Sequence, residues 1–201
     1  MDVWDSEGAA LSIFREAGID PADPPGPHAL AEALMGRGAI AYARIREDGH
    51  FSPYGARPRI YLRSGMSELR EAWTIFHELA ERHVFGEQDE AIEVACNRIA
   101  ACLRAPRAAF RWLLEDVGPE NLQELAERSG TSQTSAAMRV AEVLDVPSVI
   151  VTPATVYVRG PEWGWPDEAE LRRLSRARAV PGELRKVRLD DAKGRVLLTA
   201  K

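Results

Sequence analysis

The sequence predicts an α+β protein with a mainly helical core, a small antiparallel sheet, a helix-turn-helix-like segment and a short β-rich C-terminal tail. Two observations carry this prediction. Up to residue 144, apolar residues recur mostly at helical spacing, in segments that end at glycine or proline. From residue 147 onward, short runs rich in β-branched residues alternate with turn-forming residues, which is typical of strands.

The first third of the chain predicts two helices followed by the sheet. We expect helices at 6–18 and 28–36, joined by a proline-rich connector that cannot be helical. Residues 39–46 and 59–63 are strand-like, and turn-forming residues between them predict a loop. We therefore expect these two strands to pair as a small antiparallel sheet.

The middle of the chain predicts three further helices, over 67–84, 90–103 and 107–117, each followed by glycine or proline. Ser67 can cap the first of them. Apolar residues three and four positions apart predict its buried stripe, made of Leu69, Trp73, Phe76, Ala80 and Val84.

Residues 118–146 have helix-turn-helix spacing, with Gly130 at the turn and Ser132 as the cap of the second helix. DNA binding by this segment is not expected. Phosphate contacts supply much of the affinity of DNA-binding proteins, and here five acidic residues accompany only Arg128 and Arg139. Packing against the preceding helices is the favoured role.

The tail, residues 147–201, predicts strands at 149–151 and 155–159, a short helix capped by Asp167, and a hairpin from 185–189 and 195–199. Its middle is rich in arginine, which could meet a phosphate backbone or an acidic partner but more often forms a solvated face.

The amino-acid composition limits the classes of protein to which this chain can belong. A chain of 201 residues with 45% hydrophobic and 28% charged residues is ordinary for a globular protein of one or two small domains. A net charge of −5 argues against a surface that coats nucleic acid. The acidic start lacks the features of a secretory signal, and no apolar run is long enough to span a bilayer. Cys96 and Cys102 are expected to be reduced core residues. We therefore expect a cytoplasmic protein without membrane contact.

The candidate site lies in the helix at 67–84. His77 and Glu78 begin a zinc-protease motif, in which a second histidine normally stands four residues after the first. That position holds Glu81, whose carboxylate is also a zinc ligand. Glu93, on the next helix, could supply a third ligand, which leaves Glu78 to activate water and Asn97 to orient a ligand. The alternative is that these are ordinary polar residues of solvated helix faces.

The stretch from 73 to 110 resembles the ImmA/IrrE family of zincin-like metallopeptidases. The matching residues are His77, Glu78, Leu79, Glu93, Asn97, Ala100, Ala101, Leu103 and Pro106. The resemblance implies a zincin-like peptidase domain over 1–117, with His77, Glu81 and Glu93 as metal ligands and Glu78 as general base. It also implies zinc as the metal, with manganese as an alternative, and a substrate that is a repressor protein of a mobile element or stress-response circuit.

Glu81 departs from the family pattern, which has histidine there. A glutamate keeps a ligand but adds negative charge, lowers the Lewis acidity of a bound zinc and favours a harder metal. It could equally mark a protein that has lost catalysis and kept the fold. A catalytically inactive regulator or protein-interaction module is therefore the alternative function.

Overall fold

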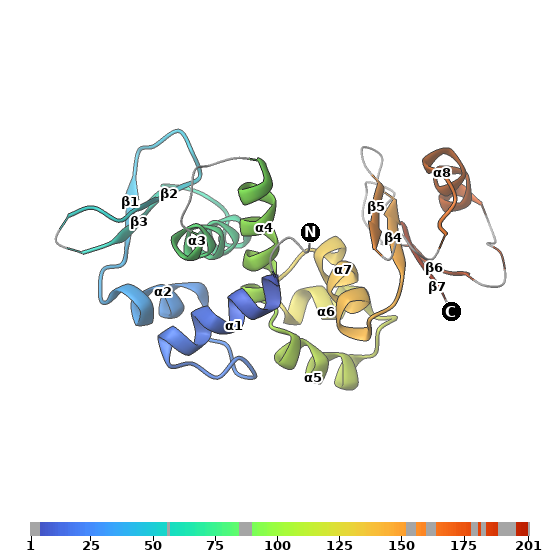
Figure 1. The fold of residues 1–201 in the computed structure, drawn as a ribbon, viewed down its shortest axis with the longest axis horizontal. Helices are drawn as coiled ribbons and strands as arrows, with labels where there is room; N and C mark the ends of the chain where they lie inside the picture. The colour runs from blue at the N-terminus through green and yellow to red at the C-terminus, as the bar shows by residue number, and fades with distance from the viewer. Residues whose placement is uncertain are drawn as a thin grey trace. The chain divides into compact units, whose positions relative to one another are not determined.

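The computed structural model describes residues 5–55, 57–84, 90–151, 156–159, 164–177, 181, 184–188 and 196–200. The chain divides into two compact units, residues 1–109 and 110–201 (Figure 1). Among the described residues, no helix is both long and apolar enough to cross a bilayer.

The described part of the first unit contains four helices, which are α1 (Ser6–Ala17), α2 (Pro27–Met35), α3 (Glu68–His83) and α4 (Glu90–Arg104). All four lie where the sequence predicts them, to within one or two residues, because their ends carry strong local signals. Gly18 ends α1 in the left-handed conformation, at φ 69°. Ser67 caps α3, with its hydroxyl oxygen accepting a hydrogen bond from the Arg70 amide.

The sheet of the first unit has three strands, β1 (Ile40–Ala43), β2 (Gly49–Ser52) and β3 (Arg59–Arg63), in the order β1-β3-β2. β2 pairs with β3 antiparallel, whereas β1 pairs with β3 parallel. The expected antiparallel pairing of 39–46 with 59–63 is therefore wrong, and the sheet is mixed. The reason is β2, for which the sequence predicts a loop and which occupies the antiparallel position beside β3.

The core of the first unit lies between α3 and its neighbours. α3 contacts β2 and β3 on one side and α4 on another (Figure 1). Its buried apolar residues are Ile75, Phe76, Leu79 and Ala80, with Val84 just after its end. Leu69, expected in this stripe, is 58% exposed, because the first turn of α3 extends beyond the packed core.

The second unit begins within α5 (Arg107–Val117) and continues with α6 (Leu122–Arg128) and α7 (Gln133–Leu144), the expected helix-turn-helix pair. A four-stranded antiparallel sheet follows, in the order β5-β4-β7-β6. Its strands are β4 (Ser148–Val151), β5 (Val156–Arg159), β6 (Leu184–Arg188) and β7 (Val196–Ala200).

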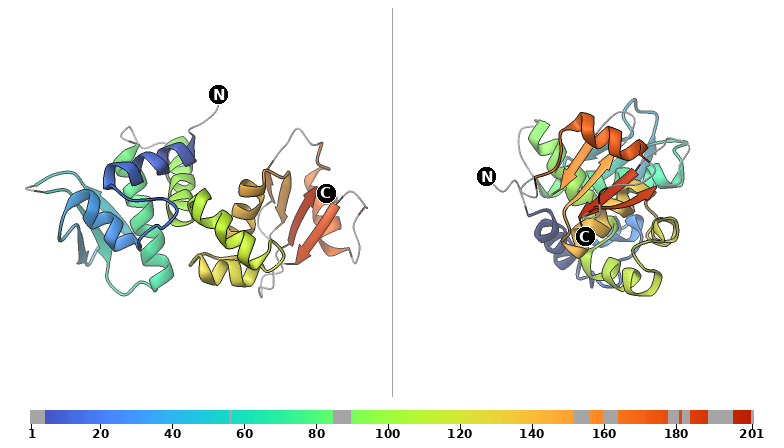
Figure 2. Two further views of the ribbon diagram at one scale, coloured as in Figure 1. Left: turned by 90° about the horizontal axis from the view of Figure 1, so that it is seen from below. Right: turned by 90° about the vertical axis from the view of Figure 1, so that its right-hand side faces the viewer.

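α8 (Glu168–Arg176) packs on β4 and β7 (Figure 2). The predicted cap by Asp167 and the predicted pairing of the last two strands are confirmed. The turn expected between those strands, at 190–194, lies outside the described residues. The combination of a largely helical chain with two small sheets confirms the predicted α+β class.

Candidate metal centre

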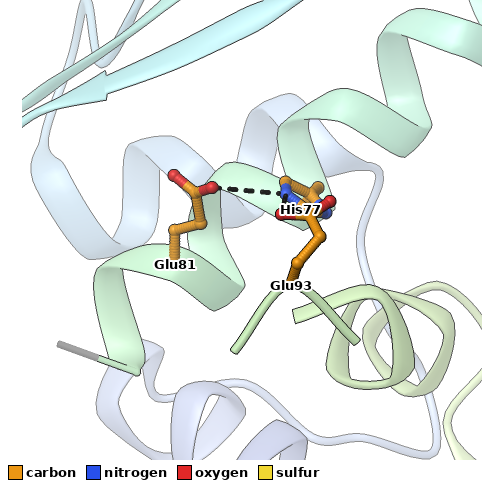
Figure 3. Close-up of side chains that lie close together, drawn as sticks. All are labelled: His77, Glu81 and Glu93. Atoms are coloured by element: carbon orange, nitrogen blue, oxygen red, sulfur yellow. Dashed lines mark ion pairs between the residues drawn. The ribbon is translucent and has the colours of Figure 1, made fainter. Parts of the chain in front are cut away.

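Two packed helices supply the candidate site. His77 and Glu81 lie one turn apart on α3, so both side chains leave the same helix face. Glu93 lies in the first turn of α4, which runs alongside α3. One ligand atom from each of these residues lies within 4.8 Å of the others, and the two glutamates converge on His77 (Figure 3). The structure thus brings together the three residues that the sequence analysis named as ligands.

His77 is the centre of this cluster. Its Nε2 lies 3.3 Å from Glu81 Oε1 and 3.6 Å from Glu93 Oε2. Burial lowers the pKa of His77, but the hydrogen bond to Glu81 and the charges of Glu93, Glu81 and Glu78 outweigh burial and raise it above its ordinary value. The cluster therefore attracts positive charge, either a proton on His77 or a cation.

Asn97 supports Glu93, as its position one turn later on α4 predicts. Its Nδ2 donates to the Glu93 carbonyl oxygen at 2.9 Å and to the Glu93 carboxylate at 3.3 Å. This restrains an otherwise exposed glutamate, whose side chain is 59% accessible. The side chains of His77 and Glu81 are only 14% and 25% accessible. The cluster is thus closed on the α3 side and open to solvent beside Glu93.

Glu78 is a buried neighbour of the ligand cluster and is not one of its three members. It is only 5% exposed, and its Oε2 has no hydrogen-bond partner among the described residues. Burial, followed by the nearby charge of Glu81, raises its pKa to about 7, although His77 and the Phe51 amide act in the opposite direction. A carboxylate that titrates near neutral pH beside a cluster of metal ligands is suited to accept a proton from water.

Sequence reasoning missed two residues next to Glu78. The backbone amide of Phe51 donates a hydrogen bond to its carboxylate. A Cβ atom on Gly49 would lie 2.6 Å from Glu78 Oε1 and 2.3 Å from Thr74 Cγ2, so only glycine fits there. In the sequence, the Asp48-Gly49 pair predicts a turn. A glycine inside a strand would have indicated this close approach, had β2 been recognised.

Two other residues near the centre stay outside the ligand cluster. His83, six residues after His77, lies near Glu16 instead. The pKa of Glu16 is lowered mainly by Arg82 and to a lesser degree by His83. Cys96 is fully buried on α4, and burial together with the charges of Glu81, Glu93 and Glu78 raises its pKa to about 11. Among the described residues, the Cys96 sulfur does not belong to the group of ligand atoms that converges at His77.

The ligand atoms suit a divalent cation. Imidazole nitrogen and carboxylate oxygen both bind zinc, and a set with two carboxylates also suits harder cations such as manganese. Three such ligands with solvent access on one side would leave a coordination position open, as a catalytic metal requires. Next to these ligand atoms, Glu78 Oε2 accepts no hydrogen bond from any residue that the structure describes.

Three comparisons with known proteins bear on this centre. The family model described as the IrrE N-terminal-like domain, a peptidase family, matches residues 38–141, which include all the site residues. No curated protein matches the sequence. A solved structure described as a Mycobacterium tuberculosis transcriptional regulator is similar, with a TM-score of 0.55 and 15% identity. The match covers 77% of this chain and 54% of that one, so the chain spans about half of the regulator's length, and the likeness concerns the fold alone.

Proposed function

The chain belongs to the IrrE N-terminal-like family of peptidases, and from that premise we propose that it is a zinc-dependent endopeptidase. His77, Glu81 and Glu93 would hold the metal, and Glu78 would be the general base. The observation that supports this most is the meeting of one histidine and two glutamates from α3 and α4, with a buried carboxylate next to them.

When bound, zinc would supply Lewis acidity, which polarises a peptide carbonyl and makes water more acidic. The protein's own contribution is the proton acceptor. Glu78 has a pKa raised to about 7, so it can take a proton from the attacking water near neutral pH and return it to the leaving amine. Asn97 would hold Glu93 in place through its hydrogen bonds to that residue.

The first test is the metal content of the purified protein by elemental analysis. We expect about one zinc per chain, lost in His77→Ala, Glu81→Ala and Glu93→Ala. His83→Ala and Glu90→Ala are matched controls from the same two helices and should keep the metal. Absence of metal after incubation with zinc or manganese would overturn the peptidase proposal. Metal lost in His77→Ala but kept in Glu81→Ala would remove Glu81 from the ligand set.

The substrate we propose is a repressor protein of a mobile element or a stress-response circuit. This rests on the family resemblance. The similar solved structure, described as a transcriptional regulator, is compatible with such a setting. The test is to label new protein N-termini in a cell extract after adding the zinc-loaded protein. One dominant new N-terminus, absent with Glu78→Gln, would support specific cleavage, whereas equal patterns with both proteins would contradict it.

Glu81 favours a second function, that of a catalytically inactive regulator or interaction module on a peptidase fold. It places a third carboxylate beside His77, together with Glu78 and Glu93. Glu81→His separates the two functions. An active peptidase adapted to Glu81 should lose cleavage in this variant, whereas a protein that lost catalysis through Glu81 should gain it. Glu81→Gln, which keeps the shape but not the charge, is the control.

DNA is not among the partners that we propose. Arg139, the basic residue of α7, is only 6% exposed and pairs with Glu142 at 2.8 Å. Arg128 pairs with Asp116 at 2.6 Å. We therefore expect no salt-sensitive binding to duplex DNA at low ionic strength, as measured by fluorescence anisotropy.

A cytoplasmic setting fits Cys96 and Cys102, which are reduced and buried.

A further inference from the structure

β2 lies at the edge of the sheet and approaches α3 more closely than a side chain would permit. The Asp48 carbonyl accepts a hydrogen bond from the Arg63 amide, which directs the backbone of this residue toward β3. Because backbone hydrogen bonds alternate along an antiparallel strand, the amides of Gly49 and Phe51 are directed away from β3. The Phe51 amide instead donates to Glu78.

Gly49 makes this approach possible. A methyl group on it would overlap two different atoms, Thr74 Cγ2 at 2.3 Å and Glu78 Oε1 at 2.6 Å. Both residues are buried, so neither can move into solvent. Thr74 is held further by its hydroxyl, which donates to the Arg70 carbonyl at 2.9 Å.

The start of β2 is also fixed to α3 by charge. Asp48, directly before Gly49, forms ion pairs with Arg63 of β3 and with Arg70 in the first turn of α3. At the other end of the contact, the Phe51 side chain packs against the hydrophobic core. The strand is thereby held on both sides of the point at which it meets Glu78.

We propose that β2 positions the general base, with Gly49 and the Phe51 amide as positioning residues that fix the Glu78 carboxylate. The inference rests on the proposed function, because it assigns the contact to the base of that reaction. It goes further by placing the control of that base on a strand that carries none of the candidate ligands.

The experiment compares Gly49→Ala, Thr74→Ser and the double variant. Thr74→Ser removes the methyl group that blocks a Cβ at position 49 but keeps the hydroxyl, so the double variant restores packing and leaves only the overlap with Glu78. Gly26→Ala is the matched control, since its backbone is extended and a Cβ there meets nothing within 4 Å. The readouts are thermal stability, zinc content, the rate at which new N-termini appear, and the Phe51 amide proton in NMR spectra of the metal-free protein.

We expect the double variant to match Thr74→Ser in stability and zinc content. Its cleavage rate should fall about 100-fold, because a displaced base is poorly oriented. Its Phe51 amide signal should move to the position seen in Glu78→Ala, where the hydrogen bond cannot form, while Gly26→Ala should resemble the unmodified protein in every readout.

A double variant with an unchanged Phe51 signal and an unchanged rate would overturn the inference. The NMR readout requires neither metal nor substrate. An unmodified chain that binds no zinc and cleaves nothing would therefore overturn the proposed function, while the Phe51 signal would still decide whether Gly49 fixes the Glu78 carboxylate.

Discussion

Glu78 and Glu81 lie one turn apart on α3 but in different surroundings. Glu81 is partly accessible and reaches His77, whereas Glu78 is buried against β2. Burial disfavours the charged form of a carboxylate and raises the pKa of Glu78 to about 7. In the proposed reaction, Glu81 would be a metal ligand and Glu78 would transfer the proton.

The raised pKa of Glu78 predicts how the stability of the metal-free protein depends on pH. In the unfolded chain this carboxyl ionises near 4.5 and in the folded protein near 7. As pH rises between these values, the unfolded state loses its proton first, so folding stability falls, and the loss is complete above about pH 7. Glu78→Gln removes this effect and should be more stable than the unmodified protein at pH 8, by on the order of 2–3 kcal/mol.

Urea unfolding at pH 4.5 and pH 8, with a chelator present, measures this difference. The advantage of Glu78→Gln should largely vanish at the lower pH. The exposed Glu90 on α4 offers the control, since Glu90→Gln should change stability little at either pH. An equal stability of Glu78→Gln and the unmodified protein at pH 8 would show that Glu78 ionises in the folded state without a penalty.

At the scale of single residues, the sequence identified those candidate site residues whose spacing along a helix places them on one face. His77 and Glu81 are one turn apart, and Glu93 and Asn97 are one turn apart, so helical geometry alone predicted which of them share a face. The same reasoning could not find Phe51, because it contributes a backbone amide, which every residue except proline has. Its role depends on where β2 lies, and no property of the phenylalanine side chain indicates it.

Among the elements, the helices were predictable and the sheet was not. α3 and α7 each begin at a serine whose side chain accepts a hydrogen bond from a backbone amide of the first turn, a signal contained within four residues of sequence. β2 is four residues long and contains Gly49, so it exists chiefly through its pairing with β3. Such pairing joins segments that are distant in the sequence, so local sequence patterns do not predict it.

The two serine caps give a prediction at the scale of the elements. Ser67→Ala should destabilise the first unit by about 1 kcal/mol, and Ser132→Ala should destabilise the second by a similar amount. Amide hydrogen exchange, read separately over α3 and α7, would assign each loss to its own helix. Each variant serves as the control for the other. Protection lost equally in both helices with either variant would mean that the two units unfold as one.

At the scale of the whole molecule, the candidate centre is confined to one unit. The hydrophobic core that surrounds it runs from Ala10 to Leu103, and every candidate ligand falls between these residues. Residues 1–109 form a compact unit. The division into peptidase domain, helix-turn-helix-like segment and tail at 117 and 146 stays a prediction from the sequence.

A fragment of residues 1–109 should therefore fold and bind metal without the rest of the chain. We expect a cooperative thermal transition by circular dichroism and the same zinc content as the full-length protein. The same fragment with His77→Ala should fold but bind no zinc. A fragment that stays unfolded with zinc present would show that the first unit depends on the second for its stability.

The positions of the two cysteines have a consequence for how this protein could be followed in solution. The chain has two, Cys96 and Cys102, and both are buried on α4 within the first unit. A buried thiol does not react with a disulfide reagent until the helix around it opens. The rate of thiol modification would therefore report how often α4 opens. It would not report opening within the second unit, because both cysteines belong to the first. A metal ion held between α3 and α4 should lower the rate of thiol modification.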